Sequence, residues 1–324
     1  MISCPGVILR LNRLPINKMC FMKTILRNSG LLLLVAIIFV SGEVHAQQKK
    51  SEKSLLWKVS GNGLKQPSYL FGTYHLLGDK FLAEVPEVQQ PFAEAKGVVV
   101  ELVLDSSRLM TIIMQKAVMT NNKLSTLLSP SDYHLVDSVF RALSGYELKT
   151  FDMFKPAQIT VMFALFQAQK ELGEELKKYT GTPLDIHFAS VAKKNGVQVT
   201  PLETMDQQFD MLYNHFTVEE QAKQLVELVK QSDSAGKFSG DMTKLYFQKD
   251  VMGLGELLES YPTELGGNME YMLKDRNLNW MKTLPELMKS GSQFIAVGAG
   301  HLPGGNGLIS LLQKQGYKVT PVTK

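Results

Sequence analysis

The chain has 324 residues, with 35 lysines and arginines against 31 acidic residues, which gives a formal net charge of +4. Five of the basic residues and one acidic residue precede position 47, so the remainder carries thirty of each and a net charge near zero. This balance favours neither a nucleic-acid partner nor a membrane-surface partner, and both cysteines lie in the same early stretch.

The first 46 residues have the features of a secretory signal peptide. Lys23 and Arg27 precede the apolar run LLLLVAIIFV at 31–40, and small residues end the stretch at Ala46. The run is too short to span a bilayer comfortably, although an uncleaved anchor is the alternative interpretation. We expect cleavage after Ala46, which gives a secreted or periplasmic chain with no transmembrane segment. The true start is Met1, Met19 or Met22.

After a polar linker at 47–54, we expect residues 55–324 to form one large domain without disulfides. Strand-like runs at 55–61 and 68–76 flank the turn-rich NGLKQP and predict a β-hairpin. A short helix is expected over 86–96. The next run, GVVVELVL at 97–104, is apolar on both faces, which is typical of a central strand.

Helical spacing then dominates from about 107 to 178. A helix at 183–196 and a strand at 197–203 form half of an α/β unit. Residues 205–291 are again mostly helical, and the C-terminal stretch after 293 predicts strand, helix and strand. The fold class is therefore α/β, with a mixed central sheet built from N- and C-terminal strands and a large helical insertion or cap.

Two glycine-x-x-histidine turns follow apolar runs, from Gly72 to His75 and from Gly298 to His301. Glycine lets the backbone turn sharply and lets a ligand approach, and strand ends are frequent positions for functional sites. Either histidine by itself is most often a hydrogen-bonded structural residue. As a matched pair, the two turns are expected to meet at one edge of the sheet.

Glu101 is a carboxylate within the apolar run at 97–104. Burying it costs several kcal/mol unless it is paired, hydrogen-bonded or bound to metal. One interpretation is an ion pair with an arginine such as Arg276. The other is a metal ligand or general base, because two histidines and a carboxylate form a known ligand set for a catalytic metal. Glu203 at a strand end and Arg276 with Asn277 on a helix are weaker candidates.

Several segments together resemble the TraB/PrgY/GumN family over about residues 55–323: YLFGTYHLL, VVVEL, PLDIHFASVAKKNGVQVTPLETMDQQ, DRNLNW and FIAVGAGHLPGGNGLISLLQKQGYKVTPV. The resemblance implies a mixed α/β fold with both Gly-x-x-His motifs and a strand glutamate at one site. By matching position these are His75, His301 and Glu101. The family's Leu-Glu-Thr and Arg-Asn elements fall on Glu203 and on Arg276 with Asn277. The family is related to the Tiki metalloproteases and, more remotely, to erythromycin-esterase and ChaN-like proteins.

These features predict a metal-dependent hydrolase, similar to the Tiki peptidases, that acts outside the cytoplasm on a peptide or small-molecule substrate. His75, Glu101 and His301 are the expected ligands of one divalent ion, which would be Mn²⁺, Co²⁺ or Zn²⁺. Arg276 is expected to stabilise the developing oxyanion. A further set is expected to support the site: Gly72, Gly298, Glu203 and Asn277.

Two alternatives stay open. The chain is either a non-catalytic protein that binds a peptide or glycan on the same scaffold, or an esterase in which a histidine acts as general base without metal. The three expected ligands discriminate between these hypotheses, because a metal centre requires them to lie close enough to share one ion.

Overall fold

The computed structural model describes residues 53–260 and 270–323. The expected signal peptide at 1–46 and most of the linker at 47–54 lie outside these residues. No helix in the described ranges combines the length and the apolar character that crossing a membrane requires.

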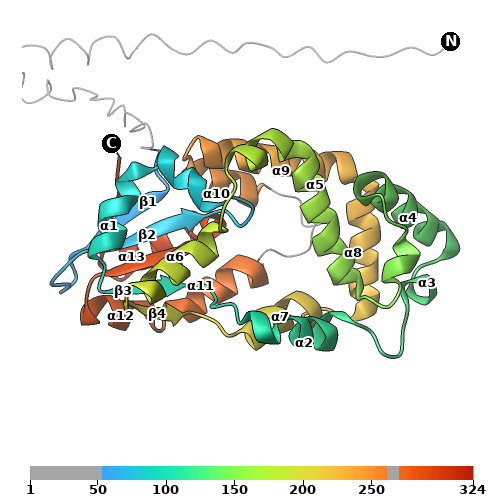
Figure 1. Cartoon of the computed structure of the whole chain (residues 1–324), viewed down its shortest axis with the longest axis horizontal. Coiled ribbons are helices and arrows are strands. Elements are labelled where there is room, and N and C mark those ends of the chain that lie inside the picture. Colours follow the sequence, from blue (N-terminus) through green and yellow to red (C-terminus); the bar gives the residue numbers. More distant parts are fainter. Residues whose placement is uncertain (1–52, 261–269, 324) are drawn as a thin grey trace, which may run out of the picture. The chain divides into compact units, whose positions relative to one another are not determined.

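The described residues form a six-stranded mixed sheet with the strand order β4-β3-β5-β2-β1-β6 (Figure 1). The strands are β1 (Leu56–Ser60), β2 (Ser68–Thr73), β3 (Gly97–Val100), β4 (Gln198–Pro201), β5 (Gln293–Gly298) and β6 (Lys318–Pro321). Strands β4, β3, β5 and β2 run parallel to one another, whereas β1 is antiparallel to both β2 and β6. The predicted α/β class, with a mixed sheet built from both ends of the chain, is confirmed.

The α-helices in the described ranges are α1 (Gln89–Glu94), α2 (Ser106–Ala117), α3 (Leu124–Leu127), α4 (Pro130–Ser144), α5 (Pro156–Lys178), α6 (Leu184–Lys194), α7 (Met205–Asn214), α8 (Val218–Lys230), α9 (Ser232–Phe247), α10 (Val251–Glu259), α11 (Asp275–Trp280), α12 (Leu284–Ser290) and α13 (Leu308–Lys314). Shorter turns of 3₁₀ helix cover Asp79–Glu84, Pro86–Val88, Leu148–Phe151 and Ala299–His301, and Glu270–Lys274 is a π-helical turn. Local sequence signals set several of these starts. Thr204 and Gln207, for example, form a reciprocal capping box at the start of α7.

The predicted hairpin, the long helical stretch and the C-terminal strand, helix and strand are all present. The strand expected over 97–104 is wrong in length, because β3 ends at Val100. Val100 is the last residue of β3 in register with β5, opposite Ala296. Just beyond it, the backbone N–H of Gly298 donates to the Glu101 side chain instead of to a backbone carbonyl. The side-chain contact replaces the next rung of the ladder, and the chain leaves the sheet there.

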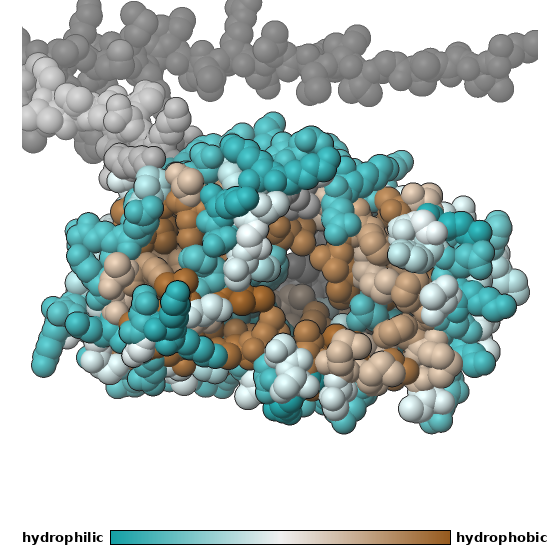
Figure 2. Space-filling view, in the orientation of Figure 1, coloured by the Kyte–Doolittle hydropathy of each residue, from teal (hydrophilic) through white to brown (hydrophobic). Residues whose placement is uncertain are grey.

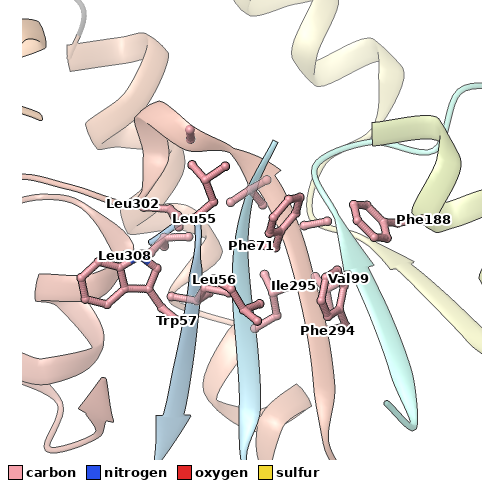
Figure 3. Packing of buried hydrophobic residues seen from close by; sticks show 14 of the residues in the cluster. Leu55, Leu56, Trp57, Phe71, Val99, Phe188, Phe294, Ile295, Leu302 and Leu308 are labelled. Carbon is pink, nitrogen blue, oxygen red and sulfur yellow. The ribbon is translucent and has the colours of Figure 1, made fainter. Parts of the chain in front are cut away.

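Three clusters of buried hydrophobic residues stabilise the described chain. The largest surrounds the sheet, where Phe188 of α6 packs on Phe71 and Phe294 with ring centroids 5.4 and 4.9 Å apart (Figure 3). A second cluster joins α3, α4, α5 and α8 around Phe140 and Phe163. A small third cluster lies between α2 and α7. The helical segment therefore has a core of its own, separate from the core of the sheet.

Candidate active site

The two Gly-x-x-His turns meet because their strands are parallel neighbours. Strand β2 pairs with β5 in a register that sets Thr73 opposite Gly298. His75 and His301 follow these positions closely, and both leave the sheet at the same edge. The carboxyl ends of parallel strands are the usual position of ligand sites in open α/β sheets.

Two carboxylates reach this edge from the neighbouring strands. Glu101 directly follows β3, and Glu203 comes two residues after the end of β4. The backbone N–H of Glu203 donates to the carbonyl oxygen of Glu101 over 2.9 Å, which holds the two exits side by side. Each of the four parallel strands thus delivers one polar side chain to the same edge.

Gly72 is needed for close packing. A methyl group at this position would lie 3.0 Å from both the Cα and the Cβ of Ala299, which is tighter than ordinary contact. The carbonyl oxygen of Gly72 also accepts a hydrogen bond from the Tyr246 hydroxyl over 3.0 Å. Glycine here lets the turn that carries His301 pack directly on β2.

Gly298 is needed for the site itself. A methyl group there would lie 3.1 Å from Glu101 Oε1, 3.6 Å from His301 Cδ2 and 3.9 Å from His75 Nε2. The three expected metal ligands therefore converge around one point beside this glycine. Their catalytic and metal-binding roles stay predictions.

Arg276, on α11, links these groups through its guanidinium. Nη2 donates to Glu101 Oε2 over 2.5 Å and to Glu203 Oε2 over 3.0 Å, and Nε donates to Glu203 Oε1 over 2.8 Å. Nη1 donates to His301 Nε2 over 3.0 Å and to the Met272 carbonyl over 3.2 Å. All five N–H donors of the guanidinium are used. The ion pair between Glu101 and Arg276, one of the two interpretations of that carboxylate, is present.

This ion-pair network is buried. The side chains of Arg276, Glu101 and Glu203 are 10%, 8% and 7% exposed. Trp280 covers it, because its ring lies 4.9 Å from the guanidinium and its Nε1 donates to Glu203 over 2.9 Å. Two carboxyl groups therefore share one guanidinium in this buried network.

Burial raises the pKa of the Glu101 carboxyl, but attraction to His301 and to Arg276 outweighs this effect, so that its pKa is about 2. Burial also lowers the pKa of His301 to about 3. At neutral pH, His301 is therefore uncharged and Arg276 supplies the main compensating charge for the Glu101 carboxylate.

The hydrogen bonds of His301 specify its tautomer. Asn277 donates its amide N–H groups to the carbonyls of His301 and Asn306 over 3.1 and 2.9 Å, so its Oδ1 remains as an acceptor. His301 Nδ1 lies 2.8 Å from that oxygen and must donate to it. Nε2 then carries the lone pair, which accepts from Arg276 and faces the site. This is the tautomer that a metal-binding histidine needs.

His75 is oriented by Asp185, a residue that the sequence reasoning missed. His75 Nδ1 lies 2.6 Å from Asp185 Oδ2, and the Thr73 hydroxyl donates to the other oxygen. The Asp185 carboxylate raises the pKa of His75 to about 9. The His75 side chain is 69% exposed, so it faces solvent within the site.

Backbone hydrogen bonds between the segment after His75 and the start of α6 bring Asp185 to His75, although the two residues are 110 positions apart in sequence. Gly78 donates to the Tyr179 carbonyl over 2.7 Å, and Leu184 donates to the Leu77 carbonyl over 3.0 Å. A side chain at Gly78 would collide with the backbone of Thr180. Asp185 lies in the first turn of α6, where acidic residues are common because they interact favourably with the helix N-terminus. No local signal therefore connects it with His75.

Two cavities flank His75. One, of about 330 Å³, is lined by Glu101, Asp185, Lys193 and Gln208, together with apolar residues of the segments around them. The other, of about 260 Å³, contains the Arg276 side of the site and the Gly298–His301 turn. The candidate site is therefore open to a ligand from both sides.

The residue types fit a divalent metal, but Arg276 already donates hydrogen bonds to two of the three expected ligands, Glu101 and His301. Glu101 Oε1 and His301 Nε2 are 3.8 Å apart, and two ligands at ~2.1 Å from one ion lie roughly 3–3.5 Å apart. Arg276, however, occupies the lone pair of His301. Within the described ranges, no three or more His, Cys, Asp or Glu side chains are grouped so as to hold a metal ion.

Fold and site together define an α/β protein with a histidine, carboxylate and arginine site at the carboxyl ends of its parallel strands. The chain belongs to the TraB/PrgY/gumN family, whose family model matches residues 55–321. The resemblance noted in the sequence is therefore confirmed.

Two curated relatives carry protease names. The chain is 23% identical over 328 residues to "Metalloprotease TIKI2" of Danio rerio, which covers 84% of this chain and 61% of that protein. It is 22% identical over 353 residues to "Metalloprotease TIKI homolog" of Amphimedon queenslandica, covering 89% of this chain and 67% of that protein. The chain thus spans less than two thirds of the length of the Danio rerio relative. No solved structure matches the chain.

Proposed function

We propose that this chain is a metal-dependent hydrolase that cleaves peptides outside the cytoplasm. The observation that carries the proposal is the convergence of His75 Nε2, Glu101 Oε1 and His301 Cδ2, each within 4 Å of the point that a methyl group on Gly298 would occupy. The two carboxyl groups that share Arg276 and the neutral tautomer of His301 support the binding of a cation there. The names of the two relatives favour protease chemistry.

In this proposal His75, Glu101 and His301 hold one Mn²⁺, Co²⁺ or Zn²⁺ ion. Such an ion lowers the pKa of bound water and polarises a carbonyl group. Asp185 fixes the ring of His75 through Nδ1, and Nε2 binds the ion after losing the proton that the raised pKa of about 9 keeps on the ring at neutral pH. Asn277 does the same for His301.

Arg276 has two roles in this proposal. It must release His301 Nε2 for that nitrogen to bind an ion, while its two hydrogen bonds to Glu203 keep the guanidinium beside the site. From there it stabilises the negative charge that develops on the carbonyl oxygen of the substrate.

Metal binding and peptide hydrolysis test the proposal together. Protein treated with chelator and then dialysed is titrated with each of the three ions by calorimetry, and a peptide library is digested with and without EDTA. His75→Ala is expected to abolish binding and hydrolysis. The matched control is His134→Ala, which removes an exposed histidine of α4. Wild type that binds none of these ions, or His75→Ala that binds them as wild type does, would contradict the proposed metal centre.

A second candidate rests on the pair formed by His75 and Asp185. A histidine oriented by a carboxylate and exposed in a cavity is also the arrangement of a general base, which a pKa of about 9 makes available in alkaline solution. The chain would then hydrolyse esters without metal. Hydrolysis that persists in EDTA but disappears in His75→Ala favours this candidate, and binding without turnover in either assay favours a non-catalytic peptide- or glycan-binding protein.

A further inference from the structure

An apolar groove leads away from the candidate active site into the helical segment. The 260 Å³ cavity beside His75 and a further cavity of about 360 Å³ share Phe238, Met242 and Met272 as lining residues, so the two adjoin along these side chains. The further cavity is lined by residues of α5, α7, α8, α9 and the π-helical turn. Figure 2 shows a hollow with mostly hydrophobic walls between the sheet and these helices. We call the two joined cavities the apolar groove.

Charge is confined to one end of the groove. Among the described residues that line the further cavity there is no Asp, Glu, Lys, Arg or His. In the nearer cavity the charged groups near neutral pH are His75 and Arg276, which belong to the site itself. Any ligand that reaches past the site therefore meets uncharged surface, and a charged group placed there would lose its hydration without a partner.

Polar groups nevertheless occur at intervals along the groove. Thr160, Gln224 and Ser239 line the further cavity and are half-buried. In the part of the chain that the structure describes, none of these three side chains has a hydrogen-bond partner. A peptide backbone carries N–H and C=O groups that suit them, whereas a hydrocarbon chain would leave them unsatisfied.

We propose that the apolar groove binds an uncharged, apolar stretch of the substrate polypeptide, on one side of the bond that is hydrolysed. The inference rests on the proposed function, which it deepens by naming the substrate class. Continuity with the site determines the occupant, because the nearer end of the groove opens among the groups proposed to act on the scissile bond. The flanking sequence then selects the substrate by burying its side chains.

The test measures binding and cleavage separately. The probe is a fluorescently labelled short peptide rich in Leu, Val and Phe, compared with a peptide of the same length in which Glu and Lys alternate at these positions. Wild type is expected to bind the apolar probe at least about tenfold more tightly than the charged one.

Two variants change the groove in different ways. Met242→Glu places a charge at the junction of the two cavities, and Ala164→Phe fills the further cavity from an exposed position on α5. Both are expected to weaken binding of the apolar probe about tenfold or more. The matched control Met110→Glu replaces a methionine of α2 that is 65% exposed and outside the groove, and it should bind as wild type does. Circular dichroism verifies that each variant is folded.

Equal binding of both probes by wild type, or unchanged binding in both Met242→Glu and Ala164→Phe, would overturn the inference. So would a fluorescent fatty acid that displaces the peptide and binds more tightly than it. Binding of the apolar probe that the groove variants abolish, without hydrolysis of any peptide, retains the groove and rejects the hydrolase. Hydrolysis with no preference for apolar flanks retains the hydrolase and rejects the role of the groove.

Discussion

The two oxygens of Glu101 have different partners. Oε1 accepts from the Gly298 N–H and Oε2 accepts from Arg276, each over 2.5 Å. In Glu101→Gln the amide oxygen can keep the Gly298 bond, and Arg276 keeps its hydrogen bonds to Glu203. We therefore expect a loss of about 1–3 kcal/mol in EDTA, less than the roughly 3–5 kcal/mol that follows when a buried charge loses its partner outright.

Thermal melts of Glu101→Gln in EDTA and in excess Mn²⁺ measure both effects. The variant should lose the rise in melting temperature that the ion produces in wild type. Glu203→Gln is the matched control, because it disturbs the same guanidinium but leaves the three proposed ligands intact. A metal-induced rise that persists in Glu101→Gln would remove that residue from the ligand set.

Asp185 is the residue whose replacement should change the charge state of His75. The pKa of His75 is raised from its ordinary value of 6.5 to about 9, mainly by this carboxylate. A raised pKa contributes stability that is fully present below pH 6.5 and is lost as the pH rises through 9. Asp185→Asn should therefore lower the His75 pKa and destabilise the metal-free protein more at pH 6 than at pH 9.5.

Nuclear magnetic resonance titration of the His75 ring in chelator-treated protein measures that pKa directly. Asp206→Asn is a matched control, since Asp206 is about half exposed and contacts Arg108 instead of the site. A His75 pKa that is the same in Asp185→Asn and wild type would contradict the assignment.

The candidate site lies at the ends of the parallel strands, and adding one methyl group at Gly298 tests whether the ion binds there. In Gly298→Ala the added carbon would lie 3.1 Å from Glu101 Oε1, among the proposed ligands. The φ angle of −51° at this position is open to alanine, so the backbone is not strained. We expect metal affinity to fall at least about tenfold in calorimetry, while the free energy of unfolding changes by less than about 1 kcal/mol.

Gly305→Ala is the control for this change. It adds the same methyl group in the same C-terminal motif, where nothing lies within 4 Å. Equal metal affinities in the two variants would mean that the ion binds elsewhere.

Much of this arrangement was predictable from the strands. The apolar runs that end in Gly-x-x-His indicated that both histidines leave the same edge, and the run before Glu101 indicated a central strand. The end of β3 at Val100 was not predictable, because it depends on a hydrogen bond from Gly298, nearly two hundred positions away. Asp185 was missed for the same reason. Its contact with His75 depends on backbone hydrogen bonds between segments that are distant in sequence, and not on any local pattern.

The network of Arg276 was anticipated only in part. An ion pair with Glu101 was one interpretation of a carboxylate in an apolar run, but the guanidinium donates two hydrogen bonds to Glu203 and only one to Glu101. Spacing along the sequence cannot divide one guanidinium between two carboxylates, because that division follows from where α11 packs over the sheet edge.

Across the whole described chain, the separation of the sheet core from the helical core has a consequence for cooperativity. Phe294 on β5 and Phe140 on α4 are both fully buried, one in each cluster. Truncating either to alanine should cost about 3–5 kcal/mol. The proposed ligands follow strands of the sheet and lie outside the helical core. Phe140→Ala is therefore expected to loosen the helical segment and retain metal binding.

Native-state hydrogen exchange, read element by element, measures this difference. In Phe140→Ala, protection should fall in α4, α5 and α8 while β2, β3 and β5 keep theirs, and the melting temperature should still rise with Mn²⁺. In Phe294→Ala, protection should fall in the sheet as well, because the most protected amides exchange only through global unfolding. If Phe140→Ala accelerates exchange equally in the sheet and the helices, the two cores unfold as one cooperative unit, and the helical segment cannot adjust to a ligand without disturbing the site.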